Sequence, residues 1–455
     1  MSAALLVSVV VAALILVGSF VLAYFKPAGQ IGTASILADR STGALYVNVG
    51  GVMHPALNLA SARLIAGQSA NPKFVPGNEI RQSPVGPMVG IVGAPQDLTV
   101  RRPAATGWAV CDRLGSTGSL VVPKVTVIAG LGELGDWAHD VNAPRAAVMG
   151  YGGHTYVVTD GHRAEIDLRD KAVTLALGLQ ATDLRPAPMS RALYEALAPT
   201  PALRVPDIPT PDAPVGYGEN LVSGSVIRVQ DVNGSAQFFV VLSSGVQQVP
   251  ETVATMIRNA GIAGGQILQA DADKVAKMPQ FTGIDVRHYP PVKVQLVDKA
   301  AEPVTCVMWR KDAAEPQARV TAVSGRRLPI PVGGEQRLVK LVNAGPVVAD
   351  EVWVSPDSAN FVQVTGVEPS SPRNESLWWI SDSGVRFGIQ TAGQDEQQTR
   401  SALGLEGPPT PAPWAVIRWL PAGPVLSRAA ALTQHDTLAG DPSPAPLPTQ
   451  KAGTN

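Results

Sequence analysis

The residues from Gly152 to Leu168, GGHTYVVTDGHRAEIDL, combine side-chain types that could perform chemistry. The stretch holds two of the six histidines of the chain, two aspartates, an arginine and a glutamate. Two histidines with nearby carboxylates can bind a metal ion or transfer a proton, provided that the backbone brings them together.

The same stretch has the pattern of a β-hairpin. Tyr156–Thr159 is a strand-like run, apolar and polar residues alternate along Ala164–Leu168, and Asp160-Gly161 between them is typical of a type I′ turn. The glycine supplies the positive φ that such a tight turn needs.

This hairpin register separates the two histidines. Thr159 opposes His162, and His154 opposes Asp167, so the histidines lie about 16 Å apart at the rise of a strand. They are then too far apart to share a metal ion. We interpret His154–Asp167 as an ordinary cross-strand pair and the stretch as structural.

A second polar cluster lies in GLGELGDWAHD, Gly130 to Asp140. It gathers Glu133, Asp136, His139 and Asp140 in a glycine-containing loop, which could hold a cation but is more typical of a solvated loop. The other histidines are scattered. The sequence has no phosphate-binding G-x-x-x-x-G-K-[ST], no H-E-x-x-H and no G-x-S-x-G. We predict no catalytic, cofactor-binding or metal-ligating residues.

The strand–turn–strand–helix pattern occurs four times. Besides the first unit, it is found at Leu45–Gly67, Phe238–Gly261 and Leu377–Gln390 with its following helix. The predicted turns contain Gly51, Gly161, Gly245 and Gly384, the last two preceded by Ser244 and Ser383. A single hairpin is marginally stable. We therefore expect these units to pack on a common core.

Strands between the units could form that core. The candidates are GPMVGIVGAPQDL (Gly86–Leu98), GWAVCDRL (Gly107–Leu114), VTCVMWRKD (Val304–Asp312) and IRWLPAGPVL (Ile417–Leu426). The sequence predicts a central sheet assembled from these distant segments. The proline-rich stretch from Val205 to Gly216 would divide the two halves as a semi-rigid linker.

The N-terminus is uncharged from Ala3 to Phe25. As a helix these residues would extend about 35 Å, enough to cross a hydrocarbon core of about 30 Å. Tyr24, Phe25 and Lys26 suit a membrane interface. A cleaved signal peptide would have a shorter apolar run and a basic lead. We predict a transmembrane anchor.

Composition limits the function classes. The chain has 455 residues, 45% of them apolar, and a formal net charge of -1. This charge gives no field for nucleic acid. The only cysteines are Cys111 and Cys306, whose spacing fits no zinc or redox motif. Outside the cytosol an even pair favours a disulfide, which would stabilise the fold by about 5 kcal/mol. The alternative is two buried thiols.

Several of these segments together resemble the EccB subunit of mycobacterial type VII (ESX) secretion systems. The resemblance depends on the N-terminal span, ILADRSTGALYVNVGGVMHPALNLASARLI (Ile36–Ile65), IRQSPVGPMVGIVGAP (Ile80–Pro95), GWAVC (Gly107–Cys111), Cys306, and the units that end in ALGL at Leu179 and Leu405. It extends over nearly the whole chain.

The resemblance implies an inner-membrane, single-pass protein with most of its chain in the periplasm. It implies a dimer of EccB through periplasmic domains, one disulfide, the partners EccC, EccD and EccE, and docking of the mycosin protease. The family also has an ATPase label, which no residue motif here supports. The family has a cytosolic segment ahead of the span, whereas this sequence opens at the span.

We therefore predict an α+β fold: a single transmembrane helix, then an elongated periplasmic domain of four strand-turn-strand-helix repeats around a central β-sheet core. The expected segments are 1–27 (anchor), 31–70 (repeat 1), 71–130 (core), 131–204 (repeat 2), 205–216 (linker), 217–280 (repeat 3), 281–345 (core), 346–406 (repeat 4), 407–428 (core return strand) and 429–455 (disordered tail).

The predicted function is a structural component of a secretion complex. One alternative is a nucleotide-dependent hydrolase. The other is a cell-envelope binding module that presents Trp378 and Trp379 to glycan; strand alternation places these two on opposite faces, so at least one should lie in the core. The structural role predicts no cofactor.

Overall fold

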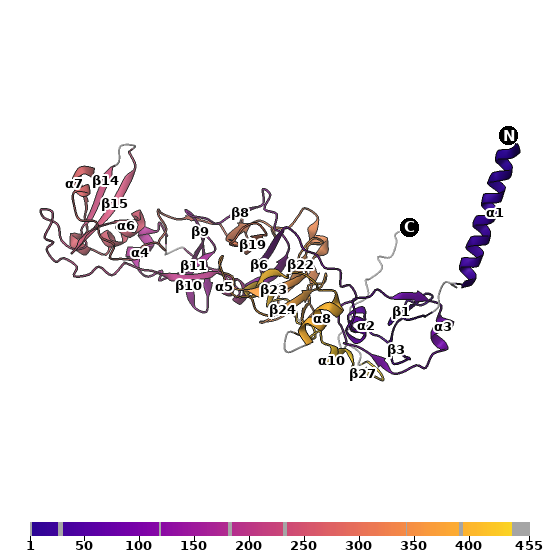
Figure 1. Cartoon of the computed structure of the whole chain (residues 1–455). Helices are drawn as coiled ribbons and strands as arrows, with labels where there is room; N and C mark the ends of the chain where they lie inside the picture. Colours follow the sequence, from indigo (N-terminus) through magenta and orange to yellow (C-terminus); the bar gives the residue numbers. More distant parts are fainter. Residues whose placement is uncertain are drawn as a thin grey trace, which may run out of the picture. The chain divides into compact units, whose positions relative to one another are not determined.

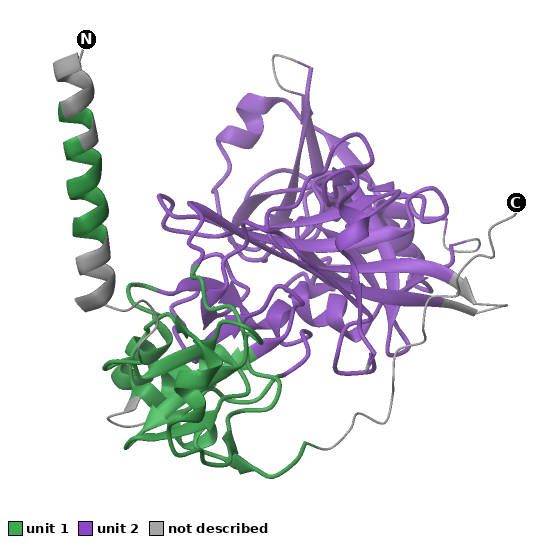
Figure 2. Cartoon of the chain, turned by 90° about the vertical axis from the view of Figure 1, so that its right-hand side faces the viewer, with its two compact units in different colours: residues 1–100, 387–408, 423–455 green, residues 101–386, 409–422 purple. Residues whose placement is uncertain are grey.

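The chain folds into one long N-terminal helix, shorter helices and several sheets, an α+β architecture (Figure 1). This computed structural model describes residues 2–25, 31–117, 120–180, 184–230, 234–342, 344–390 and 395–438. The chain divides into two compact units (Figure 2). Unit 1 comprises residues 1–100, 387–408 and 423–455, and unit 2 comprises residues 101–386 and 409–422.

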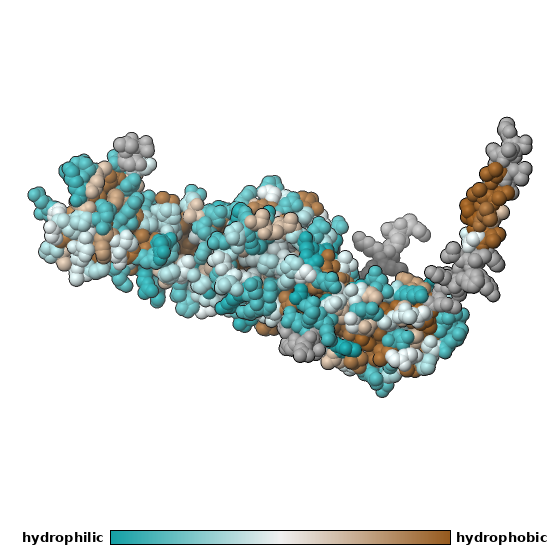
Figure 3. Space-filling model, viewed as in Figure 1, coloured by the Kyte–Doolittle hydropathy of each residue, from teal (hydrophilic) through white to brown (hydrophobic). Residues whose placement is uncertain are grey.

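Unit 1 begins with the uncharged helix α1 (Ser2–Phe25). Its described apolar side chains are exposed: Val7, Val10, Val11, Leu14, Ile15, Leu16 and Val17 (Figure 3). Counting only fully described residues, no helix is both long enough and apolar enough to cross a membrane.

The sheet of unit 1 has the strand order β3-β2-β1-β4. Its strands are β1 (Ile36–Asp39), β2 (Leu45–Val49), β3 (Val52–Pro55) and β4 (Lys73–Val75). Gly50 and Gly51, with φ of 61° and 88°, form the turn between β2 and β3. Helix α2 (Leu59–Ala66) packs on β2, and β4 then pairs in parallel with β1.

The remaining elements of unit 1 are α3 (Gly77–Arg81), β5 (Met88–Val89), α8 (Asp395–Leu403), α10 (Arg428–Ala431) and β27 (Gln434–His435). Helices α8 and α10 contact α2, and β27 pairs with β5. The predicted disordered tail therefore begins too early, because Ser427 caps α10 and β27 belongs to a sheet. Residues 439–455 of that tail lie outside the described residues.

Unit 2 contains a seven-stranded sheet with the order β21-β22-β7-β6-β19-β20-β8. Its strands are β6 (Ala105–Thr117), β7 (Leu120–Ala129), β8 (Ala138–Asp140), β19 (Val304–Asp312), β20 (Arg319–Gly325), β21 (Val339–Lys340) and β22 (Glu351–Val354), with the 3-10 turn η2 (Gly334–Arg337) before β21. The two cysteine-bearing strands, β6 and β19, pair antiparallel near its centre.

Two segments predicted for this central sheet lie elsewhere. Within 86–98, β5 pairs with β27. Within 407–428, β26 (Thr410–Pro413) joins another sheet and Trp414–Ile417 is helix α9. Conversely, β8 and β22 belong to the central sheet, although they fall within the predicted repeats 131–204 and 346–406. Strands of two to four residues have too little pattern to assign them to a sheet from sequence.

The second sheet of unit 2 has the order β12-β9-β10-β11-β13, and β18 also pairs with β9. Its strands are β9 (Arg145–Tyr151), β10 (His154–Thr159), β11 (His162–Ile166), β12 (Ala187–Pro188), β13 (Ala198–Leu203) and β18 (Gln295–Leu296). Helix α4 (Lys171–Ala176) follows β11, and α5 (Arg191–Ala196) follows β12.

The third sheet has the order β16-β15-β14-β17. Its strands are β14 (Val226–Gln230), β15 (Ala236–Leu242), β16 (Gly245–Val249) and β17 (Ile267–Gln269), accompanied by α6 (Glu251–Asn259), η1 (Ile262–Gly265) and α7 (Ala272–Ala276). Helices α4 and α6 pack together, so the second and third sheets share one apolar core.

The proline-rich segment 205–216 does not separate compact units. It lies within unit 2, and Ile208 is buried in the core that the second and third sheets share. The Asp212 carboxylate accepts the Ala263 N–H at 2.9 Å, and the Ser223 hydroxyl donates to the Pro209 carbonyl. The prediction of a linker, which depends on proline content, is therefore wrong. Burial of Ile208 and the hydrogen bonds fix the segment within unit 2.

The fourth sheet contains β23 (Phe361–Thr365), β24 (Leu377–Ile380) and β26, with β25 (Arg386–Gly388) at the point where the chain leaves unit 2. Trp379 is buried, whereas Trp378 is half-buried and its ring lies 5.8 Å from that of Trp414. The two tryptophans thus differ in burial, as strand alternation predicts.

The four small sheets share one topological feature. In each, the first two strands pair antiparallel, and a strand that follows the helix returns parallel to the first strand. The parallel pairs are β1–β4, β9–β12, β14–β17 and β23–β26. The hairpin pattern in the sequence contained no signal for this returning strand.

Candidate functional site

A disulfide joins Cys111 of β6 to Cys306 of β19. The two residues face each other directly in the antiparallel register, and both are fully buried. The bond closes a sequence separation of 195 residues and lies inside the central sheet of unit 2. It therefore holds together two strands that are distant in the sequence.

The residue after Cys111 anchors a helix to the same sheet. The Asp112 carboxylate is fully buried and accepts hydrogen bonds from the Ser190 N–H at 2.7 Å and the Ser190 hydroxyl at 2.5 Å. Ser190 is also the N-cap of α5, and its oxygen accepts the Leu193 N–H. Asp112 thus fixes the start of α5 against the sheet.

Burial dominates the electrostatics of Asp112. It raises the pKa of the carboxyl to about 7, against the opposing hydrogen bonds from Ser190 and the charge of Lys299. Lys299 is half-buried, and desolvation lowers the pKa of its ammonium to about 8. The Lys299 Nζ donates to neutral acceptors, the Val304 carbonyl and the hydroxyls of Thr305 and Ser324. Two titratable groups with shifted pKa values therefore lie at the central sheet, one within β6 and one donating to β19 and β20.

A second buried acidic group lies on β22. The Glu351 side chain is 3% exposed and forms ion pairs with Arg113 at 2.8 Å and Lys124 at 2.6 Å. The two cations come from adjacent strands, β6 and β7, so the cluster links three neighbouring strands of the sheet. Two positive partners compensate the buried carboxylate.

The four predicted turn glycines occupy different environments. Gly51 and Gly161 lie in two-residue turns and have φ of 88° and 74°. Gly384, φ 81°, lies in a longer loop between β24 and β25. Gly245 is not in a turn: Leu242 pairs with Gly245, so Ser243-Ser244 form the turn. A Cβ on Gly245 would lie 2.4 Å from the Pro279 carbonyl oxygen, which is the reason for glycine there.

The predicted pair of His154 with Asp167 is wrong. Strand β11 ends at Ile166, and the His154 Nδ1 lies 2.7 Å from a Glu165 carboxylate oxygen. The Asp167 carboxylate instead accepts hydrogen bonds from the N–H and the guanidinium of Arg169, just beyond the strand. The hairpin register itself is as predicted, with Thr159 opposite His162.

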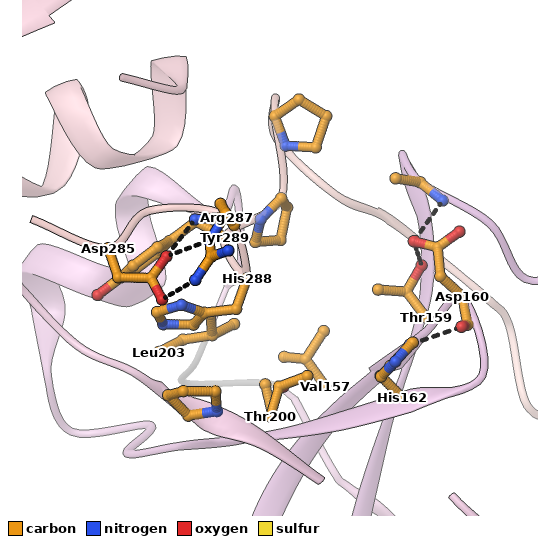
Figure 4. Close-up of a pocket in the computed structure, with 15 residues that line it drawn as sticks. Val157, Thr159, Asp160, His162, Thr200, Leu203, Asp285, Arg287, His288 and Tyr289 are labelled. Carbon is orange, nitrogen blue, oxygen red and sulfur yellow. Dashed lines mark hydrogen bonds and ion pairs between the residues drawn. The ribbon is translucent and has the colours of Figure 1, made fainter. Parts of the chain in front are cut away.

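The stretch Gly152–Leu168 does border a cavity of about 520 Å³ in unit 2. One wall contains Thr159, Asp160 and His162, and the facing wall contains Asp285 and the segment that begins with Arg287, His288 and Tyr289 (Figure 4). Val157, Ala164 and Leu203 give the cavity an apolar floor. Sequence reasoning missed the facing wall, because it lies more than 120 positions away in the chain.

Several polar groups of the cavity have partners, whereas both ring nitrogens of His288 are buried without a hydrogen bond to any described residue. The Arg287 guanidinium bonds both oxygens of Asp285 at 3.0 Å and holds the pKa of that carboxyl well below its usual range. The His162 Nδ1 lies 2.7 Å from the Asp160 carbonyl, which can only accept, so Nδ1 has the proton. Burial lowers the pKa of His288.

The Thr159 hydroxyl lies 3.2 Å from the Asp160 carboxylate, but the Arg145 carbonyl is closer to that hydroxyl, at 3.0 Å. The hydroxyls of Thr159 and Thr200 each donate to a backbone carbonyl, of Arg145 and Arg163 respectively. Arg287, its single lining Lys or Arg among the described residues, is neutralised by Asp285. Among the described lining residues, no lysine or arginine is left without an acidic partner to bind a phosphate chain.

The cluster at 130–140 is partly a strand and not a loop. His139 and Asp140 lie in β8, which pairs with β20, and Asp136 lies 3.6 Å from the Arg326 guanidinium. Throughout the part of the chain that the structure describes, no group of three or more His, Cys, Asp or Glu side chains could hold a metal ion.

These features define an α+β scaffold organised around a disulfide-linked sheet. The chain belongs to the EccB family of type VII secretion systems: the family model described as "Type VII secretion system ESX-1, transport TM domain B" matches residues 1–440. The predicted family is thereby confirmed.

Three relatives from ESX secretion systems are similar over almost the whole chain. The ESX-5 secretion system ATPase EccB5 of Mycobacterium tuberculosis H37Rv is 42% identical over 98% of this chain and 88% of its own length. The ESX-2 secretion system ATPase EccB2 of the same strain is 40% identical, covering 96% and 89%. The ESX-3 secretion system ATPase EccB3 of Mycolicibacterium smegmatis is 40% identical, covering 94% and 83%.

Solved structures agree with the fold. The periplasmic assembly from the ESX-5 inner membrane complex contains a chain that is 41% identical, with a TM-score of 0.80 over 92% of this chain and all of that chain. A chain of the EccB3 dimer from the ESX-3 core complex is 36% identical, with a TM-score of 0.76 over 88% of this chain and all of that one.

Proposed function

We propose that this protein is a structural, membrane-anchored subunit of an ESX secretion complex and acts by holding other subunits together. The similarity to the periplasmic assembly of the ESX-5 inner membrane complex supports this proposal most directly, because that whole chain aligns with this one at 41% identity. The similar EccB3 chain was solved as a dimer. Self-association through the parts beyond α1 is therefore part of the proposal.

The proposed anchor is α1. Ala3–Phe25 contains no charged residue and is long enough, at about 35 Å, to cross a bilayer. The rest of the chain then lies in the periplasm, where an oxidising environment maintains a disulfide such as Cys111–Cys306. The chain is a single-pass inner-membrane protein in this account.

The proposed scaffold consists of four copies of one module around the central sheet. The shared strand pairing of the four small sheets supports this, since each has a strand returning parallel to its first strand. Four similar surfaces on one chain suit a subunit that contacts several partners: a second EccB, EccC, EccD, EccE and the mycosin protease.

The three relatives named above are called ATPases, so nucleotide hydrolysis is the second candidate function. The described cavity favours the structural role, because Asp285 neutralises Arg287 and no other lysine or arginine is described in the lining. Purified chain should hydrolyse ATP no faster than a preparation in which Arg287 is replaced by alanine.

Assembly in cells tests the proposal. In a strain lacking this chain, native gel analysis of mild detergent extracts should show the remaining inner-membrane subunits dispersed, and wild-type chain should restore one large species. An intact large species without the chain would contradict the structural role.

A further inference from the structure

We infer that β4 and the loop after β1 form a contact surface for anionic lipid headgroups, on the membrane in which α1 is anchored. This inference deepens the proposed function and rests on the proposed anchor. We call the surface the β4 patch and define it as Arg40, Lys73 and Phe74.

The β4 patch exposes an aromatic side chain between two cations. Phe74 is 58% exposed, compared with 43% for Phe281 and 36% for Trp414. It lies in β4, at the edge of the sheet of unit 1, directly after the exposed Lys73. The Arg40 guanidinium donates to the Phe74 carbonyl at 3.3 Å, so its charge is held beside the ring.

Neither cation of the patch is neutralised by a described carboxylate. Lys73 Nζ donates to the Ile31 carbonyl at 3.5 Å, and Arg40 donates to the Phe74 carbonyl. The nearest acidic residue in the sequence, Asp39, is buried and accepts from the N–H and hydroxyl of Ser41. The patch therefore presents two positive charges and an apolar ring to its surroundings.

The chain keeps this patch close to the end of α1. Lys73 contacts Ile31, which is six residues after Phe25, the last residue of α1. Six residues extend at most about 20 Å. If α1 spans the bilayer, the β4 patch must lie within that reach of the membrane surface.

The positive charge of this part of the chain favours anionic lipid headgroups as the ligand of the β4 patch. The segment Lys26–Arg81 has five lysines or arginines and two acidic residues, a net charge of +3, whereas the whole chain has -1. Basic residues near an anionic bilayer contribute about 1 kcal/mol each, and aromatic rings favour the interface. The positive segment is thus the part of the chain that the tether holds nearest to the headgroups.

Hydrogen exchange of the full chain in lipid nanodiscs tests the inference. Amides of 31–42 and 73–75 should exchange about fivefold more slowly in nanodiscs of phosphatidylglycerol than in nanodiscs of phosphatidylcholine. The triple variant Arg40→Glu, Lys73→Glu, Phe74→Ser should lose this difference. A matched triple variant in unit 2, Lys274→Glu, Lys277→Glu, Phe281→Ser, should retain it.

The outcomes separate the two proposals. A chain that does not enter nanodiscs of either lipid overturns the anchor and this inference with it. A chain that enters nanodiscs but whose 31–42 and 73–75 amides exchange equally in both lipids overturns this inference alone. The same holds if these amides are protected only when the other complex subunits are present. Unchanged exchange of α2 in phosphatidylcholine shows that the variants fold.

Discussion

The carboxylate of Asp112 accepts two hydrogen bonds from Ser190, a residue 78 positions later in the chain. Ser190 in turn caps α5, and Asp112 adjoins the disulfide residue Cys111. One fully buried carboxylate thus connects the start of a helix to the cross-linked centre of the sheet. The stability of unit 2 should depend on this contact more than on most surface features.

Replacing Ser190 by alanine should lower the free energy of unfolding by about 2–3 kcal/mol, because it removes a helix cap and leaves the buried Asp112 carboxylate with only the backbone N–H of its two donors. Ser427→Ala is a matched control: Ser427 also caps a short helix, but its oxygen accepts only the Ala430 N–H. That control should cost about 1 kcal/mol. Equal losses in calorimetry would contradict a special role for Asp112.

The stability of the protein should depend on pH through Asp112. Burial raises the pKa of its carboxyl from 3.8 to about 7, so the folded state binds a proton that the unfolded state has released. This contribution is complete below pH ~4 and is lost as the pH rises through ~7. Between pH 5 and pH 8 wild type should lose about 2–3 kcal/mol more than Asp112→Asn does. Parallel pH profiles in urea denaturation would refute the assignment.

Removing the disulfide should destabilise unit 2. The double variant Cys111→Ser, Cys306→Ser should unfold with a free energy lower by about 3–5 kcal/mol, since the bond closes a long loop in the unfolded chain. A reductant present during unfolding should lower the melting temperature of wild type and leave the double variant unchanged. Two reactive thiols in oxidised, denatured wild type would show that the bond is absent.

Two turn glycines allow backbone strain to be separated from crowding. Gly161 has φ 74°, and an added Cβ would lie 3.2 Å from Val320, whereas Gly153 has φ 85° and open space around it. Gly153→Val should cost about 1–2 kcal/mol from the left-handed backbone alone. Gly161→Val should cost measurably more in thermal unfolding. Equal losses of stability in the two variants would mean that Val320 moves away from the new side chain without a cost in free energy.

Local patterns allowed some elements of the fold to be predicted from the sequence. The register of Thr159 with His162 and the difference between Trp378 and Trp379 both follow from turn chemistry and strand alternation. At Gly245 the same reasoning placed the turn one residue late, because the contact that requires glycine comes from Pro279.

Long-range contacts could not be predicted from the sequence. Nothing near Asp112 in the chain indicates Ser190 or Lys299, and the cavity wall formed by residues 285–291 is equally remote from the hairpin that it faces. The returning strands, such as β12 with two residues, are too short to have a pattern of their own. Tertiary packing alone determines these features.

The subunit composition of the particle extracted in mild detergent tests the structural role most directly. Native mass spectrometry of an affinity-tagged chain should find at least two copies of it together with EccC, EccD and EccE. A chain recovered only as a free monomer, while those three subunits form a complex without it, would contradict the account.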